Sequence, residues 1–202
     1  MDIENKALDV EKNKEIFLGI VHEYIHRDGI DKLVSFLCKS DFFIAPCSTK
    51  FHLSCDGGLC LHSLNVYNRL KREIISEYGG LEQSPYSPET IAIVSLMHDL
   101  CKVNFYKKDV GSKKINGVWV QVPYYKIEDN LPIEHGYKSQ YILRSYINLS
   151  REESVAVMSH MGGFDSTVKG GSYTISTAFK QFPLALLLHI ADIKASNLDE
   201  VD

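Results

Sequence analysis

The sequence predicts an all-α domain with one inserted β-hairpin at about residues 104–127. Two observations predict the helices. Apolar residues recur at helical spacing through most of the chain, and typical helix-starting and helix-ending residues bound these stretches. One observation predicts the hairpin: an Asn-Gly pair lies between two β-prone runs within Lys113–Val122, and this pair is the strongest short hairpin signal.

The ends of several predicted helices are marked by specific residues. Ser87-Pro88-Glu89 combines a capping residue, a first-turn proline and an acid at the positive end of the helix dipole. Gly79-Gly80 ends the helix before it, because glycine accepts the left-handed conformation. Residues 40–58 and the Gly-rich segment 161–171 are predicted as loops. The predicted helices cover 12–39 with a break at Gly29, 59–78, a stretch beginning at Ser87, 135–148, 151–160 and 178–199.

Length and charge limit the range of functions. A chain of 202 residues fits one domain with a full-sized core. We expect residues 1–40 to form an N-terminal helical segment packed on a main domain of residues 41–202. The net charge is −4 and no block of Lys or Arg stands out, which argues against an extended nucleic-acid-binding surface. A nucleotide, another phosphorylated small molecule or a short oligonucleotide bound in a pocket stays open.

The cysteines and the apolar stretches indicate a cytoplasmic protein. The five cysteines are odd in number and contain no C-x-x-C pair, which favours reduced thiols over a disulfide framework. The polar, acidic N-terminus does not resemble a secretory signal. The longest strongly apolar stretch, around 184–190, is too short to span a bilayer, so no membrane partner is expected. The sequence gives no indication of the oligomeric state.

A His-Asp doublet is the most informative motif in the chain. His98-Asp99 ends the apolar run Ile91–Met97, where ionisable groups lower stability unless something compensates them. A bound metal ion is the simplest compensation, because imidazole and carboxylate are its usual ligands. Further His and Asp residues recur along the chain as His62, His135, His160 and Asp192.

The order and context of these residues resemble the HD-domain superfamily of metal-dependent phosphohydrolases. The resemblance covers about residues 50–195 and rests on Gly57–Val66 around His62, Leu96–Lys102 around the doublet, and Leu187–Asp192. It implies an HD-domain-like helical bundle, and the hairpin predicted from the residues would be inserted in this bundle. It also implies that one metal ion is bound by His62, His98, Asp99 and Asp192.

Two further histidines extend the resemblance. Some branches of the superfamily place two histidines between the doublet and the last Asp and hold two metals, and His135 and His160 occupy those positions. The alternative is that both contact only phosphate. A similar spacing occurs in bacterial 3′-to-5′ exoribonucleases, with a His before the first ligand where His52 stands. His52 is therefore expected to contact substrate.

The chain departs from the superfamily pattern at two points. Many relatives have Gly where Cys101 stands, and the Gly-Tyr-Pro signature of the cyclic-di-GMP phosphodiesterases is absent. The expected cofactor is one or two divalent ions per chain, and the ligand set suits Mn, Fe, Co, Ni, Zn or Mg.

The implied activity is hydrolysis of a phosphate ester or anhydride of a nucleotide or short oligonucleotide. Asp99 is expected to orient a metal-activated water, and Lys102, one turn further on, to neutralise phosphate charge. Asp165 and Lys169 in the Gly-rich segment are expected to contact substrate, the alternative being a solvated loop. Trp119, with Tyr124 and Tyr125, is able to stack on a base, although strand aromatics more often pack.

Two other functions compete with this one. The first is a 3′-to-5′ exonuclease without a separate nucleic-acid-binding domain, against which the acidic net charge stands. The second is a non-catalytic nucleotide- or metal-sensing module, against which the complete set of ligands stands.

Overall fold

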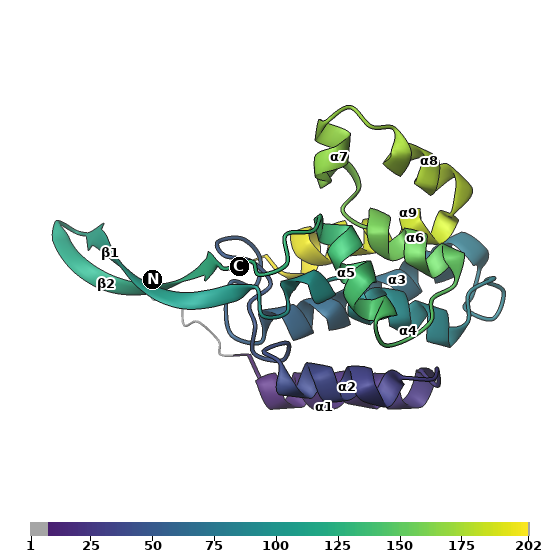
Figure 1. Cartoon of the computed structure of the whole chain (residues 1–202), viewed down its shortest axis with the longest axis horizontal. Helices are drawn as coiled ribbons and strands as arrows, with labels where there is room; N and C mark the ends of the chain where they lie inside the picture. The colour runs from purple at the N-terminus through teal and green to yellow at the C-terminus, as the bar shows by residue number, and fades with distance from the viewer. Residues whose placement is uncertain (1–7, 202) are drawn as a thin grey trace.

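A helical bundle with one two-stranded antiparallel hairpin makes up residues 8–201, the residues that the computed structural model describes (Figure 1). This arrangement confirms the predicted fold class. The longer helices are α1 (Val10–Tyr24), α2 (Ile30–Lys39), α3 (Gly58–Tyr78), α4 (Pro88–Met97), α5 (His135–Arg144), α6 (Arg151–Ser159), α8 (Thr174–Gln181) and α9 (Pro183–Lys194). The shorter elements are η1 (Leu100–Lys102), η2 (Gly162–Phe164), α7 (Ser166–Lys169) and η3 (Ala195–Asp199), and the strands are β1 (Tyr106–Ile115) and β2 (Val118–Ile127).

The core lies where α3, α4 and α9 meet. Leu70 of α3, Leu96 of α4 and Leu188 of α9 are fully buried, and each such side chain contributes about 1.5–3 kcal/mol by leaving water. Every residue of α4 from Ile91 to Met97 is buried. A helix that is apolar all round lies inside a protein. The His98-Asp99 doublet that follows α4 is therefore buried.

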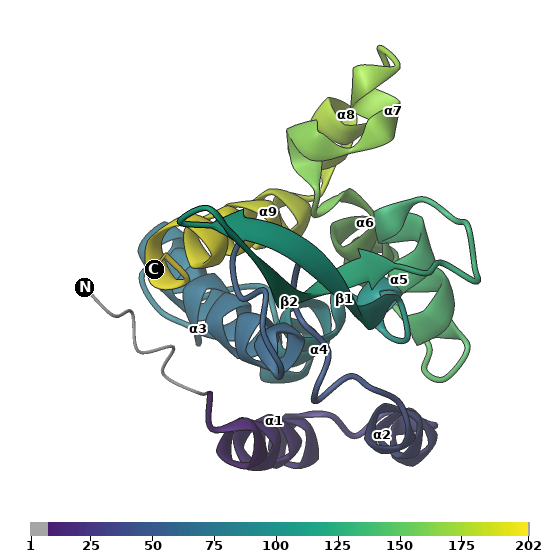
Figure 2. The ribbon, with the colours of Figure 1, turned by 90° about the vertical axis from the view of Figure 1, so that its left-hand side faces the viewer.

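The N-terminal helices lie along one side of the bundle (Figures 1 and 2). Helix α1 packs on α3 and α4, and its Phe17 and Val21 belong to the same core as those helices. Gly29, with φ of 93°, precedes α2 at the predicted break. The expected division of the chain at residue 40 stays a prediction, and its residues 1–7 and 202 lie outside the described part.

The hairpin projects from the bundle as a curved ribbon (Figures 1 and 2). Asn116 and Gly117 have φ of 50° and 85°, as a two-residue type I′ turn requires. Ile115 pairs with Val118 beside the turn, and Tyr106 pairs with Ile127 at the base. The predicted hairpin is confirmed.

Two segments differ from their predictions. The helix expected over 178–199 is broken at Phe182, which has φ of −131° and ψ of 87°, because Pro183 restricts the residue before it and has no N–H. The chain then ends its last helix in the π turn η3. The loop expected over 161–171 contains η2 and α7. Within residues 8–201, no helix has the length and apolar character to cross a membrane.

Candidate metal centre

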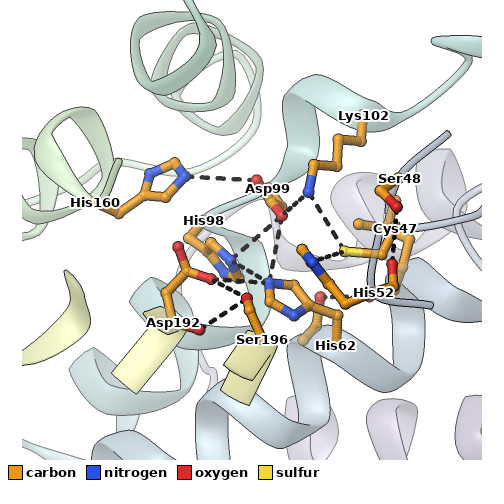
Figure 3. A network of polar contacts seen from close by, with 12 residues as sticks. Cys47, Ser48, His52, His62, His98, Asp99, Lys102, His160, Asp192 and Ser196 are labelled. Carbon is orange, nitrogen blue, oxygen red and sulfur yellow. Dashed lines mark hydrogen bonds and ion pairs between the residues drawn. The ribbon is translucent and has the colours of Figure 1, made fainter. Parts of the chain in front are cut away.

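The six predicted ligands converge from five helices on one point in the bundle, and Figure 3 labels all of them except His135. They are His62 of α3, His98 and Asp99 directly after α4, His135 at the start of α5, His160 directly after α6 and Asp192 of α9. Nε2 of His62 lies 3.2 Å from Oδ1 of Asp192, although the two residues are 130 positions apart in the sequence. The fold therefore assembles the set that the sequence indicated.

Asp99 lies at the middle of the cluster and uses its two carboxylate oxygens differently. Its Oδ1 lies 2.7 Å from Nε2 of His135 and 3.5 Å from Nε2 of His160. Its Oδ2 lies 3.5 Å from Nε2 of both His62 and His98. Each oxygen thus faces its own pair of histidines.

Two of the rings are oriented by hydrogen bonds to backbone carbonyls. Nδ1 of His98 donates to the carbonyl of Ser95 at 2.8 Å, and Nδ1 of His160 donates to that of Val157 at 2.6 Å. Because the proton is on Nδ1, each neutral ring directs the lone pair of Nε2 at the centre. Nε2 of His98 lies 3.2 Å from Nε2 of His62, and two such nitrogens this close need a proton or a cation between them.

His160 gives the clearest sign that a cation fits here. Among the side-chain nitrogen and oxygen atoms that are buried within residues 8–201, the Nε2 of His160 is the one that has no hydrogen-bond partner. Buried polar atoms nearly always have a partner. The ligand atoms of His98, His160 and Asp192 lie within 4.8 Å of one another, as do those of His62, His98 and Asp99. This donor set of nitrogens and oxygens fits a divalent transition metal.

Charges in the cluster compensate one another. Burial alone would raise the pKa of Asp99, but Lys102 and His98 outweigh it and hold this pKa well below the usual value. Burial lowers the pKa of His98 to about 4, which leaves its ring neutral at pH 7. Nζ of Lys102 lies 2.7 Å from Oδ2 of Asp99, and Asp99 raises the pKa of Lys102 well above the usual value despite burial.

Glu200 is a part of this site that the sequence reasoning missed. Its carboxylate accepts a hydrogen bond from Nδ1 of His62, 3.0 Å from Oε1, and another from Nδ2 of Asn65 at 2.9 Å. A carboxylate behind a ligating histidine fixes the ring and raises its basicity. Glu200 lies in a polar stretch near the end of the chain, and the η3 turn brings it back to α3. No sequence pattern signalled that return.

Glycines allow the helices of the site to approach closely. A Cβ on Gly136 would lie 2.1 Å from the carbonyl oxygen of Met158, so glycine at this position lets α5 approach α6. The ring centroids of His135 and His160 consequently lie 5.1 Å apart. Gly162 has φ of 53°, and a Cβ there would lie 2.1 Å from the ring of His189. Nδ1 of His189 donates to the carbonyl of His160 at 2.6 Å and so supports the ligand from behind.

A cavity of about 820 Å³ opens beside the cluster, and Asp99, Lys102 and His52 line it. Nε2 of His52 lies 3.2 Å from Sγ of Cys47, and Nζ of Lys102 donates to the same sulfur at 3.4 Å (Figure 3). Burial raises the pKa of the Cys47 thiol, but the positive charges of His62 and Lys102 outweigh it and lower this pKa to about 7. No sequence motif predicted that Cys47 would lie beside His52 and Lys102 in this cavity.

The other predicted substrate contacts do not line this cavity, although Phe164, directly before Asp165, does. Within the described part of the chain, neither Asp165 nor Lys169 lines it. Asp165 is buried and caps α7 by accepting a hydrogen bond from the backbone N–H of Thr167 at 2.8 Å, and Lys169 is the last residue of α7. Their contact with substrate stays a prediction. Cys101 has its Sγ 3.3 Å from Nε2 of His135.

Comparisons with known proteins add no assignment. No family model, no curated protein and no solved structure matches this chain. The resemblance to the HD-domain superfamily therefore rests on the sequence motifs, and the site's chemistry rests on the buried His and Asp residues that are able to hold a metal.

Proposed function

We propose that this protein is a metal-dependent phosphohydrolase that cleaves a phosphate ester or anhydride of a nucleotide or oligonucleotide. One observation carries the proposal: each carboxylate oxygen of Asp99 faces its own pair of histidines beside an open cavity. A cavity of about 820 Å³ lies within the usual range for small-molecule sites. The motifs shared with the HD-domain superfamily support the same reaction class.

The ligands divide into two groups around Asp99. His62, His98, Asp99 and Asp192 would hold one ion, and His135, His160 and the other oxygen of Asp99 would hold a second. A divalent ion bound there lowers the pKa of a bound water to about 7 and polarises a phosphoryl oxygen. Lys102 lies on the cavity side of Asp99 and supplies a fixed positive charge where a substrate phosphate enters.

The direct test is a screen of purified protein against nucleotides, short oligonucleotides and a generic phosphodiester with added Mn²⁺. The metal content is measured on the same sample. Metal-dependent release of phosphate or nucleotide supports the proposal. A protein that binds metal and nucleotides but turns over no phosphate compound in the screen is instead a sensing module.

The number of ions follows from the two groups of ligands. Wild-type protein saturated with Mn²⁺ should contain about two ions per chain, and His135→Ala should contain about one because only the second group loses a ligand. Elemental analysis after removal of free metal measures this. His22→Ala on the exposed surface of α1 is the control and should keep both ions. One ion in the wild type would reduce His135 to a substrate contact.

Lys102 should act on phosphate rather than on metal. Lys102→Ala should lower kcat/KM by about ten- to a hundredfold, because a charge-assisted contact contributes about 1.5–3 kcal/mol. Its metal content should stay the same or rise, since a cation 2.7 Å from Asp99 opposes binding of another cation. Steady-state kinetics and elemental analysis on the same sample separate the two effects. Loss of metal in Lys102→Ala would contradict this role, and Lys180→Ala on the exposed side of α8 is the matched control.

A further inference from the structure

The hairpin has a charge opposite to that of the rest of the chain. Residues 106–127 contain five lysines and one acid, Asp109, which gives a net charge of +4. Because the whole chain has a net charge of −4, the remaining residues sum to −8. Three of the hairpin lysines form exposed ion pairs, with Glu128, Asp56 and Asp109. Such pairs contribute little to stability, so these lysines are able to exchange a carboxylate for a phosphate.

Two lysines and three aromatic rings share one face of the ribbon. Residues opposite each other in an antiparallel pair lie on the same face. Lys108 is opposite Tyr125, and Lys114 is opposite Trp119. Positions two apart share that face, so both pairs lie on the face of Tyr106. Trp119 is 68% exposed. Packing in the core, the usual role of a large aromatic side chain, therefore does not explain Trp119.

This face begins at the catalytic cavity. Tyr106 lines the cavity, and its hydroxyl donates to the carbonyl of Cys47 at 3.3 Å. The next pair is anchored to the body, since Nζ of Lys108 and the hydroxyl of Tyr125 each lie 2.6 Å from a carboxylate oxygen of Asp56. From Tyr106 to Lys114 the strand runs about 27 Å at about 3.4 Å per residue. About eight stacked nucleotides cover the same length.

We propose that the hairpin is an arm that binds a single-stranded oligonucleotide, with bases stacked on its aromatic rings and phosphates paired with its lysines. Aromatic rings beside cations are the means by which proteins hold single strands without reading sequence. The arm would lead one end of the strand to Lys102 and Asp99. This second step rests on the proposed function and makes an oligonucleotide, rather than a mononucleotide, the substrate.

The alternative binding partner of the arm is a second copy of the chain, because the residues outside the hairpin have a net negative charge that complements the positive arm. The aromatic residues decide between the two. Lysines alone meet an acidic surface, whereas Trp119 and Tyr125 beside lysines on one face offer stacking that suits nucleobases. The lysines lie in two separate pairs and one single position, Lys107-Lys108, Lys113-Lys114 and Lys126, instead of forming one block, so composition alone gave no sign of a basic surface.

Trp119 makes the proposal directly measurable because it is the single tryptophan of the chain. Full-length protein in EDTA, where hydrolysis stops, is titrated with a deoxythymidine oligonucleotide of about twelve nucleotides. We expect quenching of Trp119 fluorescence and an affinity that falls steeply between about 50 mM and about 200 mM salt. Inorganic polyphosphate, which has charge but no bases, should bind without the same quenching. Because no turnover is needed, failure of the proposed hydrolysis does not affect this test.

Two variants and a charge-matched control complete the test. Lys108→Glu with Lys114→Glu, which changes the two lysines on the face of Tyr106, should weaken binding at least about tenfold and reduce the salt slope by about 1.4. Trp119→Ala, followed by anisotropy of a labelled oligonucleotide, should also weaken binding about tenfold or more. Lys12→Glu with Lys180→Glu makes the same change in net charge on exposed positions of α1 and α8 and should bind as wild type does.

Three results would overturn the proposal. The first is that wild-type protein does not bind the oligonucleotide at low salt. The second is an equal loss of binding in the hairpin variant and in the control variant. The third is concentration-dependent dimerisation in sedimentation analysis that the hairpin substitutions abolish, which would assign the arm to a second copy of the chain.

Discussion

Asp99→Ala should abolish hydrolysis and release bound metal, with a fall in kcat/KM of at least about a thousandfold. Both carboxylate oxygens of Asp99 face histidines of the cluster, at 2.7–3.5 Å, so the substitution removes a ligand from both groups at once. A bound metal supplies several kcal/mol of transition-state stabilisation, and each 1.36 kcal/mol is about a factor of ten in rate. Elemental analysis and turnover of the best substrate measure the two losses.

The fold should survive the change, because the carboxylate of Asp99 contacts the histidines of the cluster and is not part of the apolar core. Asp99→Ala leaves Lys102 without its closest acid, so Asp99→Asn, which keeps the shape of the side chain, is measured beside it by circular dichroism. Asp109→Asn on the exposed hairpin is the control and should keep full metal content. A folded Asp99→Ala protein with wild-type metal and turnover would contradict the site assignment.

The residues that the sequence located are those whose chemistry conflicts with their surroundings. His98 and Asp99 follow a run that is apolar on every side, and His62 lies among leucines, so burial of each could be read from its neighbours. The spacing of apolar residues likewise indicated the helices, and Asn116-Gly117 indicated the hairpin turn. These signals are local, and the structure confirms the helical fold with its hairpin.

Contacts between distant segments could not be read in the same way. Glu200 reaches His62 only because the chain turns back after α9, and Cys47 reaches Lys102 only because the loop before α3 folds over the cavity. Neither residue lies in a distinctive motif. Asp165 has a structural role that the polar Gly-rich segment did not indicate, because its carboxylate caps α7, while its contact with substrate stays a prediction. Short side chains such as Asp serve as helix caps as readily as ligands.

Stability should depend strongly on one ion pair that joins the N-terminal segment to the bundle. Nη1 and Nη2 of Arg27 lie 2.6 and 2.7 Å from the two carboxylate oxygens of Glu153. The side chain of Glu153 is fully buried, and it also accepts hydrogen bonds from Thr90 and from the backbone of Ser150. Arg27 also contacts Glu89 and the carbonyl of Asn148. The pair therefore connects the segment before α2 with α4 and α6.

Arg27→Ala should lower the free energy of unfolding by about 3 kcal/mol, because it leaves a buried carboxylate without its partner. For a chain of this length that is about 6–12 °C in Tm, read by thermal unfolding. Arg69→Ala is the matched control: its partner Asp199 is 30% exposed, so the loss should stay below about 1 kcal/mol. A change of Tm in Arg27→Ala no larger than in this control would contradict the prediction.

The pH dependence of that loss identifies its cause. Burial raises the pKa of Glu153, but the hydrogen bonds from Arg27, from the backbone of Ser150 and from Thr90 outweigh it, so the folded pKa lies below the usual value. A carboxyl with a lowered folded pKa stabilises the protein above its unfolded pKa, about 4.3, and this stabilisation disappears as the pH falls through the folded pKa. In Arg27→Ala only burial and the weaker contacts remain, so the folded pKa rises and protonation favours the folded variant. The difference in stability between the two proteins should therefore be full at pH 7 and shrink as the pH falls through the raised folded pKa of the variant and then through the unfolded pKa, about 4.3. A difference that stays constant over this range would mean that Arg27 stabilises the fold by packing alone.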